Sequence, residues 1–238
     1  MKETSRGVLY IAFGQYYVDE AIHSANSLKR LMPEIHVTLF TDLPVSEPCF
    51  DAVRGIEVRH KRAKVDYLRE SPYAETLYLD SDTEVRLPFS DAFLLLERFD
   101  IAAAQSLGRK SSNFSKKVRE YDEISHAFPE YNSGVIFFRR GPTMDAFFDL
   151  WREKFYAYEK ESKGRDQLSF RLALWLSDCR IHTLAPEYNV RSQAHRQRVE
   201  LASRKERSAL LTPRILHWHD LHQPPRFAFK SKHKPYRF

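Results

Sequence analysis

Two aspartates, Asp80 and Asp82, follow a short apolar stretch at residues 77–79. The stretch has the character of a buried strand, and side chains two positions apart in a strand point to the same side. Extended geometry would therefore direct both carboxylates to one spot, where they repel each other unless a cation lies between them. A hard divalent ion, Mn²⁺ or Mg²⁺, would relieve that repulsion and could also hold a diphosphate. The pattern predicts a metal site at the carboxyl edge of a sheet; an Asx turn or a helix cap is the alternative.

A histidine far along the chain is the candidate third ligand. His217 follows the apolar residues 215–216, so it is also expected at the end of a strand. A ligand from a distant strand commonly completes a mononuclear metal site. A structural role is the more frequent one for a lone histidine in a chain that has ten, and His219 and His222 are neighbouring alternatives.

Three polar clusters in the second half of the chain carry groups that bind hydroxyls. Asn132-Ser133-Gly134 precedes an apolar stretch, and an asparagine amide offers two donors and one acceptor. Asp166-Gln167 opens a helical pattern, and Tyr188-Asn189 follows Pro186. Each cluster also has a structural alternative: a hairpin or bulge turn for the first, a helix N-terminus for the second and a turn for the third.

The bulk composition is typical of a folded α/β domain. The 238 residues are 42% hydrophobic and include 17 Phe and 12 Tyr, which excludes disorder as the overall description. At this length about three quarters of the unfolded surface can be buried. No apolar run approaches the roughly 20 residues that span a bilayer, and residues 1–6 begin no signal-like segment. Cys49 and Cys179 give neither a disulfide framework nor a metal-binding spacing, so a cytoplasmic location is expected.

The net charge of +6 comes largely from the last fifth of the chain. A basic segment attracts phosphates, an anionic membrane surface or nucleic acid, and a solvated helix face is the alternative. No nucleic-acid-binding motif is present, so no nucleic acid is expected as a partner, and peripheral contact with an anionic membrane is the hypothesis for this segment. The late basic residues are Arg191, Arg196, Arg198, Arg204, Lys205, Arg207, Lys230, Lys232, Lys234 and Arg237.

Hydrophobic periodicity predicts strands that alternate with helices, which indicates an α/β fold with a largely parallel sheet. The predicted strands are residues 8–13, 35–40, 56–59, 76–79, 101–104, 134–138, 181–184 and 214–218. The predicted helices are residues 18–31, 64–71, 91–96, 143–158 and 165–176.

Residues 106–131 differ from the rest because they are polar, show little periodic apolar pattern and are too long for a plain connection. They are expected to form a variable, partly mobile loop near the site. The chain has no internal repeat and no linker, so residues 1–238 are expected to form a single domain. Within it, residues 1–105 would form the nucleotide-binding half and residues 132–238 the acceptor-side half with a basic tail.

In their order and spacing, these motifs resemble those of GT-A-fold glycosyltransferases, most closely the glycogenin and galactosyltransferase-like group called family 8. The resemblance extends over nearly the whole chain. The matching segments are residues 10–17 and 25–29 (opening nucleotide-binding strand and helix), Lys64 (a donor-contacting lysine sixteen residues before Asp80), 79–83 (the DXD motif), 132–135 (Asn-x-Gly-Val facing the donor sugar), 166–167 (Asp-Gln), 186–189 (Pro-x-Tyr-Asn) and 217–218 (His-Phe, here His-Trp).

The resemblance implies a GT-A (Rossmann-like) domain with a mostly parallel central sheet flanked by helices. It implies a metal-dependent transfer of a sugar from a nucleotide diphosphate sugar, expected to be a UDP-sugar, to a hydroxyl of a saccharide or glycoconjugate acceptor. Asp80, Asp82 and His217 would hold Mn²⁺ or Mg²⁺. The catalytic residues would be Asp166, Asn132 and Lys64. The implied donor-binding residues are Ile11, Ala12, Phe13, Tyr17, Lys64, Asp80, Ser81, Asp82, Asn132, Ser133, Gly134, Asp166, Gln167 and His217.

The stereochemical outcome follows from the role of Asp166. The resemblance favours retention of the anomeric configuration, with Asp166 orienting or stabilising the sugar. If Asp166 instead deprotonated the acceptor hydroxyl, the enzyme would invert the anomeric centre.

The chain departs from the family pattern near its end. The family reads His-Phe-x-Gly-x-x-Lys-Pro, whereas this chain has Asp220 in place of the glycine and Gln223 in place of the lysine that meets the diphosphate. Arg226 or Lys230 would be the substitute cation. Gly14 also stands where glycogenin-like members carry an asparagine near the uracil.

Two other functions remain open at the level of sequence. A haloacid-dehalogenase-type phosphatase also has Asp-x-Asp after a strand, but Glu84 stands where that class carries Thr or Val. A non-catalytic adaptor would keep the fold and bind a membrane or a polyanion through its basic C-terminal third.

Overall fold

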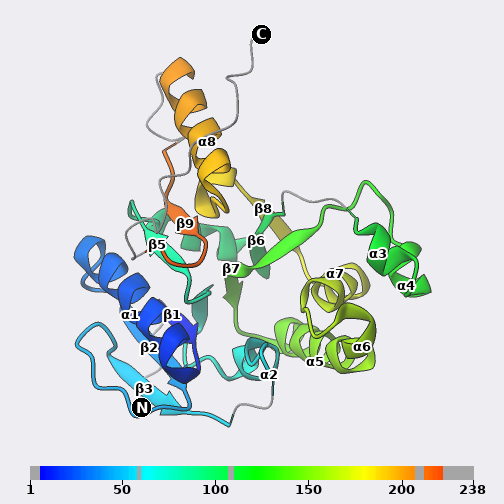
Figure 1. Cartoon of the computed structure of the whole chain (residues 1–238), viewed down its shortest axis with the longest axis horizontal. Helices are drawn as coiled ribbons and strands as arrows, with labels where there is room; N and C mark the ends of the chain where they lie inside the picture. The colour runs from blue at the N-terminus through cyan, green and yellow to red at the C-terminus, as the bar shows by residue number, and fades with distance from the viewer. Residues whose placement is uncertain (1–5, 58–59, 107–109, 207–211, 222–238) are drawn as a thin grey trace.

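The computed structural model describes residues 6–57, 60–106, 110–206 and 212–221. Its centre is a seven-stranded sheet with the strand order β3-β2-β1-β4-β7-β6-β8 (Figure 1). The strands are β1 (Arg6–Ile11), β2 (His36–Thr41), β3 (Ala52–Gly55), β4 (Glu75–Leu79), β6 (Ile101–Gln105), β7 (Tyr131–Arg139) and β8 (Ile181–Leu184). Only β7 runs antiparallel to its neighbours β4 and β6. The predicted α/β fold with a mostly parallel sheet is confirmed.

The direction of β7 decides which residues meet at the edge of the sheet. Because β7 is antiparallel to β4, its amino end lies beside the carboxyl end of β4, with Leu79 opposite Val135. Asn132 and Ser133 therefore lie at the same edge as the aspartates that follow β4. The sequence predicted these two residues just before a strand, with a turn as the alternative; the structure corrects this, because β7 begins at Tyr131 and both residues are buried within it.

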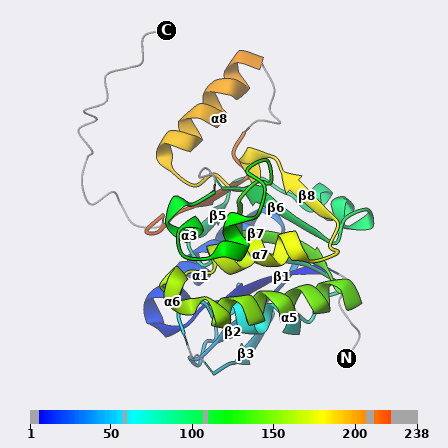
Figure 2. The same ribbon diagram turned by 90° about the vertical axis from the view of Figure 1, so that its right-hand side faces the viewer.

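Helices cover both faces of the sheet. On one face α1 (Gly14–Leu31) packs through Val18, Ala21, Ala25 and Leu28, whose spacing makes one apolar stripe, together with the 3₁₀ helix η2 (Ser90–Glu97). On the other face lie α5 (Pro142–Ala157) and α7 (Gln167–Leu176), which Figure 2 shows side by side. The helix α2 (Lys64–Tyr67) and the 3₁₀ helix η1 (Leu68–Glu70) form the predicted helix 64–71.

A second, two-stranded sheet was not predicted. β5 (Thr83–Val85) follows the aspartates directly and pairs antiparallel with β9 (Ile215–His217), so that Thr83 lies opposite His217. This pairing brings a segment from the end of the chain to the carboxyl edge of the central sheet.

The segment 106–131 is more structured than its composition suggested. It contains α3 (Ser112–Ser115) and α4 (Arg119–Asp122), whose buried side chains pack on Leu168 and Leu172 of α7. The buried side chains are Phe114, Val118, Tyr121 and Ile124. Their spacing of four, three and three residues is a helical period that the sequence reading overlooked.

Other boundaries also needed correction. The predicted strand 56–59 is wrong at residues 56–57, because β3 ends at Gly55; residues 58–59 lie outside the described part of the chain. Besides α3 and α4, three further helices in the described residues were not predicted: α6 (Glu159–Ser162), the 3₁₀ helix η3 (Pro186–Tyr188) and α8 (Gln193–Glu206). α8 projects from the body in both views (Figures 1 and 2). No helix in the described residues has the length and apolar character needed to cross a membrane.

Candidate metal and nucleotide site

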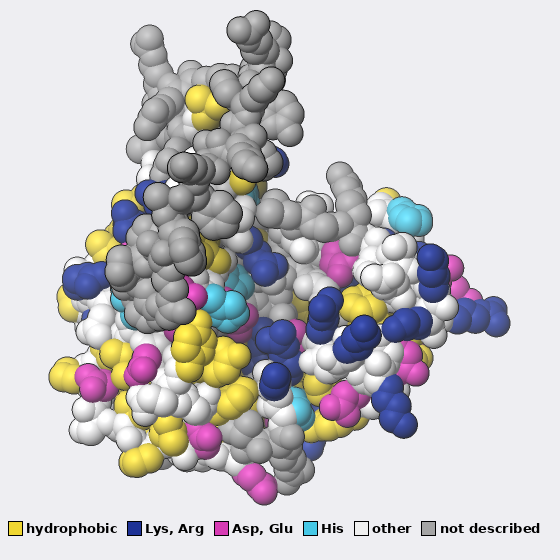
Figure 3. Space-filling view, in the orientation of Figure 1, with side chains coloured by type: hydrophobic (Ala, Val, Ile, Leu, Met, Phe, Trp, Pro, Cys, Tyr) yellow, Lys and Arg dark blue, Asp and Glu magenta, His cyan; other side chains and the backbone are white. Residues whose placement is uncertain are grey.

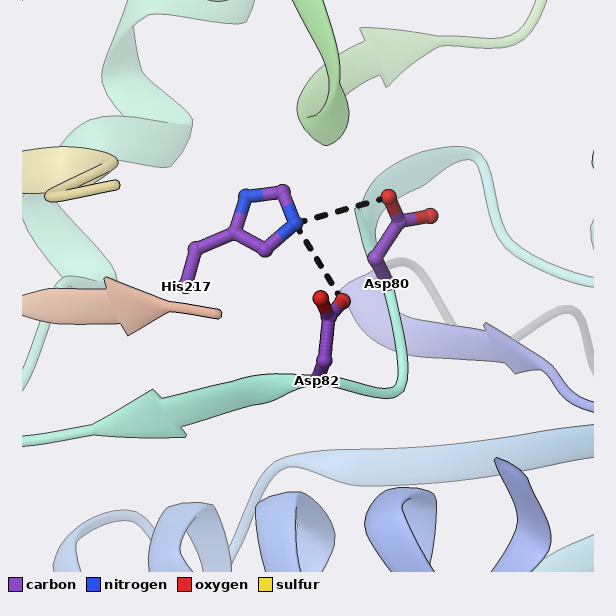
Figure 4. A group of neighbouring side chains, drawn as sticks. All are labelled: Asp80, Asp82 and His217. Carbon is purple, nitrogen blue, oxygen red and sulfur yellow. Dashed lines mark ion pairs between the residues drawn. The ribbon is translucent and has the colours of Figure 1, made fainter. Parts of the chain in front are cut away.

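Asp80, Asp82 and His217 converge at the carboxyl edge of the sheet. One ligand atom from each lies within 4.8 Å of the other two. The Nε2 atom of His217 is 3.2 Å from Asp82 Oδ1 and 3.6 Å from Asp80 Oδ2, and Figure 4 shows the imidazole pointing between the two carboxylates. The convergence that was expected of these three residues is present.

The two aspartates meet by a different route from the one predicted. β4 ends at Leu79, and Ser81 and Asp82 form a turn into β5 rather than continuing the strand. The hydroxyl of Thr83 donates to the carbonyl of Asp80 at 2.9 Å and so closes this turn. The pairing of β5 with β9 then places His217 across from Thr83, directly beside Asp82.

A buried asparagine orients the imidazole of His217. The Oδ1 atom of Asn189 lies 2.8 Å from His217 Nδ1, and the Nδ2 atom of Asn189 donates to Asn132 Oδ1 at 2.8 Å. The second bond fixes which way the Asn189 amide faces, so Nδ1 of His217 donates to Asn189. Nε2, the nitrogen that faces the carboxylates, is then the one that binds a proton or a metal ion. The sequence singled out Tyr188-Asn189 but assigned Asn189 no role.

Replacing Asn189 with alanine should lower the affinity for Mn²⁺ by about 10–100-fold, because partners that orient a metal-bound histidine contribute about that much. Isothermal titration with Mn²⁺ would measure the change. Asn189→Asp keeps an acceptor for His217 and should lose less affinity. Equal affinities for wild type and Asn189→Ala would contradict the orienting role.

Lys64 lies at the centre of the charged groups. It is buried, and its Nζ atom is 3.0 Å from Asp80 Oδ1, 2.9 Å from the carbonyl oxygen of Ser133 and 3.3 Å from Asp166 Oδ2. An ammonium has three donors, and here all three face protein oxygens. Tyr78 also donates to Asp80 Oδ1 at 2.6 Å, so Asp80 Oδ2 is the oxygen that faces His217.

The charges in the site shift several pKa values. Burial alone would raise the pKa of Asp80, but Lys64, His217 and Tyr78 outweigh it and hold that pKa well below its usual range. Burial opposes the ionised form of Asp166 as well, and Lys64 and Arg62 still lower its pKa. Burial would lower the pKa of His217, but Asp82 and Asp80 raise it above its ordinary value.

These groups fit a hard divalent cation. Two carboxylates and one imidazole are suitable ligands for Mn²⁺ or Mg²⁺, and Asn189 supplies the outer partner that such a histidine needs. The cation would compete with a proton for Nε2 of His217, which faces both carboxylates.

The affinity for Mn²⁺ should therefore fall as the pH is lowered. The pKa of His217 is raised above its ordinary value of about 6.5, so the loss of affinity should begin above pH 6.5 and should approach about tenfold per pH unit below the folded pKa. The stability of the protein without metal should depend on pH in the opposite direction. Protonated His217 stabilises the fold below its unfolded pKa, and this contribution is lost as the pH rises through its folded pKa. Titration of Mn²⁺ at several pH values tests the first statement, with the exposed His126→Gln variant as control. Flat affinity down to about pH 5 would exclude His217 as a ligand.

A cavity of about 540 Å³ opens over these residues, which is within the range of small-ligand sites. It collects nearly all the residues predicted for the site: Ile11, Ala12, Phe13, Tyr17, Lys64, Asp80, Ser81, Asp82, Asn132, Ser133, Asp166, Gln167 and His217. Lining residues that the sequence did not indicate include Lys61, Arg62, Tyr78 and Arg165. No motif marks them; the fold alone brings them to the cavity.

The segment 106–131 lies near the site, because Ser111, Phe114 and Glu130 line the cavity.

Gly134 is the one predicted site residue that does not line the cavity. It lies against two of the candidate metal ligands instead: a Cβ atom at this position would be 2.2 Å from His217 Cε1 and 2.5 Å from Asp80 Oδ2. Its N–H donates to Asn132 Oδ1 at 3.1 Å. Only a residue without a side chain allows β7 to approach His217 and Asp80 this closely.

In the turn after β9, Asp220 stands where the family pattern has a glycine, and it adopts a backbone conformation typical of glycine. Asp220 has φ of 61°, in the left-handed region that favours glycine. Its N–H donates to Glu20 Oε1 at 3.1 Å and its carboxylate accepts from the hydroxyl of Tyr16 at 3.1 Å. The Nδ1 atom of His219 lies 3.3 Å from Asp82 Oδ2, so this turn lies beside the site. His222, Gln223, Arg226 and Lys230 are outside the described residues.

Known proteins resemble this chain in structure but not in sequence. No family model matches the chain and no curated protein matches it in sequence. The structure is similar to that of galactosyltransferase LgtC in complex with donor and acceptor sugar analogues, with a TM-score of 0.59, 16% identity and coverage of 90% of this chain and 87% of that one. The glycosyltransferase GlyE of Streptococcus pneumoniae has a TM-score of 0.59 and 19% identity, with coverage of 94% of this chain and 56% of that one. Mouse xyloside xylosyltransferase 1 has a TM-score of 0.55 and 12% identity, with coverage of 93% of this chain and 99% of that one. The chain has the GT-A fold that its motifs predicted.

Proposed function

We propose that this protein is a metal-dependent glycosyltransferase that moves a sugar from a nucleotide diphosphate sugar, with uridine as the expected base, to an acceptor hydroxyl. The observation that carries the proposal is the meeting of Asp80, Asp82 and His217 beside the buried Lys64, in a cavity at the carboxyl edge of the sheet. The likeness in fold to several solved glycosyltransferases supports it.

The chemical difficulty is the negative charge that develops on the departing diphosphate. When bound by Asp80, Asp82 and His217, Mn²⁺ or Mg²⁺ would act as a Lewis acid toward the phosphate oxygens. Lys64 pairs with Asp80 and Asp166 and so offsets part of the negative charge that would repel the diphosphate. Arg191 is the proposed substitute for the missing lysine: it lines the cavity two residues after Asn189, and its buried Nε atom has no hydrogen-bond partner among the described residues.

The nucleoside would lie against the end of β1 and the start of α1. Ile11 and Ala12 line the cavity there, and the rings of Phe13 and Tyr17 are half-buried with centroids 5.5 Å apart. Both rings therefore have a face or edge left to contact a base. This half of the cavity is the proposed donor side.

Asp166 suits a role in orienting the sugar and not in removing a proton. It accepts a hydrogen bond from the hydroxyl of Ser133, and Arg62 Nε lies 3.2 Å from its other oxygen. Lys64 and Arg62 lower the pKa of Asp166, which makes its carboxylate a weak base. We therefore propose transfer with retention, with Asn132, Ser133 and Gln167 nearby to bind sugar hydroxyls. NMR assignment of the product anomer tests this, and an inverted product would overturn it.

Calorimetric titration with UDP and then GDP, each with and without Mn²⁺, tests the function as a whole. Metal-dependent binding of one nucleotide is the expected result, and it identifies the base. Hydrolysis of p-nitrophenyl phosphate without nucleotide binding would instead support the phosphatase alternative.

A further inference from the structure

The wall of the cavity around Asp166 is strongly basic. Lys61, Arg62, Lys64 and Arg165 all line the cavity there. Figure 3 shows Lys and Arg side chains gathered over the middle of this face and continuing toward α3 and α4. Lys61 and Arg62 lie in the turn that leads into α2, and Lys64 is the first residue of that helix. Arg165 directly precedes Asp166, the N-cap residue of α7.

Carboxylates neutralise only part of this charge. Lys64 pairs with Asp80 and Asp166, and Arg62 pairs with Asp166. Lys61 and Arg165 are exposed and form no ion pair within the described residues. Asp80 and Asp166 are therefore the carboxylates that pair with these cations, and Asp80 would also share its charge with the metal ion. A third carboxylate that lines the cavity, Glu130, accepts a hydrogen bond from the hydroxyl of Tyr121.

The donor does not account for the two unpaired cations. Its negative charge is confined to the diphosphate, which the metal ion, Lys64 and Arg191 would meet. Its transferred sugar would lie near Asp166. The cavity is also lined by Phe114 of α3 and by Glu130. Figure 1 shows α3 on the opposite side of the molecule from α1. That side is left for the acceptor.

We propose that the acceptor is an anionic saccharide whose phosphate or carboxylate group binds Lys61 and Arg165. This inference rests on the proposed function and adds the chemical class of the second substrate. A guanidinium binds two oxygens of such a group at once, and Lys61 adds a second charge. A neutral acceptor would leave both cations without a partner, whereas an anionic group held here would bring a nearby hydroxyl toward Asp166.

The test compares matched sugars on the protein with UDP and Mn²⁺ bound. Glucose, glucose 6-phosphate and glucuronate are titrated separately, and the readout is the affinity ratio of each anionic sugar to glucose. We expect a ratio of at least about 10 for wild type, because charge-assisted hydrogen bonds are about twice as strong as neutral ones. The ratio should fall toward 1 in the Lys61→Gln/Arg165→Gln variant and should fall with added salt. The two anionic sugars separate phosphate from carboxylate recognition.

The control is Arg30→Gln/Lys160→Gln, which removes the same two charges from exposed positions away from the cavity. This variant should keep the wild-type ratio. A wild-type ratio near 1, no binding of any of the three sugars, or a ratio unchanged in the Lys61/Arg165 variant would overturn the inference while UDP binding still supports the proposed function. Failure of UDP to bind would contradict the proposed function and, with it, the acceptor class that rests on it.

Discussion

Replacing Asp82 with alanine should abolish Mn²⁺-dependent binding of UDP. Asp82 supplies one of three ligands, and its side chain lies 3.2 Å from His217 Nε2. The remaining two ligands would then hold the ion from one side only, and we expect the affinity for Mn²⁺ to fall by more than about 100-fold, beyond the effect of losing an outer partner. Titration of Mn²⁺ and then of UDP into wild type and variant would measure both losses.

The fold of this variant should survive. The pKa of Asp82 is lowered by His217 against the effect of burial, so its ionised form stabilises the fold above about pH 4, and this contribution is lost as the pH falls through its folded pKa. Alanine should therefore cost about 1–2 kcal/mol and a few degrees of melting temperature at neutral pH. Asp178→Ala, at an exposed position outside the cavity, is the matched control and should bind as wild type. Loss of cooperative unfolding in Asp82→Ala would favour the turn or cap role for this residue.

Replacing Gly134 with alanine should disrupt the metal site by contact alone. The added Cβ would overlap with His217 Cε1 and Asp80 Oδ2, both of which are held by further hydrogen bonds or ion pairs. Overpacking of this kind costs about 1–3 kcal/mol and displaces the groups concerned. We expect weaker Mn²⁺ binding, together with a lower midpoint of denaturant unfolding, although no ligand has been removed.

The strand-end glycine Gly55 provides the comparison. A Cβ at this position meets nothing within 4 Å, so Gly55→Ala adds the same atom without the contact. It should leave Mn²⁺ affinity unchanged and alter the free energy of unfolding by less than about 1 kcal/mol. If Gly134→Ala bound Mn²⁺ as tightly as Gly55→Ala, the close approach of β7 to the ligands would not be required for the site.

Most of the fold could be predicted because local patterns determine it. Apolar stretches of five or six residues read as strands, and the stripe from Val18 to Leu28 reads as a helix, whatever the rest of the chain does. The errors fall where that pattern is weak. Four exposed residues form β3, and short helices in the segment 106–131 bury one side chain per turn. The division of the chain at residues 105 and 131, and its description as a single domain, stay predictions.

The sequence by itself determined the kinds of residue in the site and their order along the chain, including the aspartate pair after β4 and the histidine near the end. Tertiary structure decided which of these residues meet, which tautomer His217 adopts and which ion pairs form. His217 reaches Asp82 because β5 pairs with β9, and Asn189 sets its tautomer through Asn132. Lys64 faces Asp80 and Asp166. Local periodicity carries no information on contacts between segments far apart in the chain, since these depend on how whole elements pack.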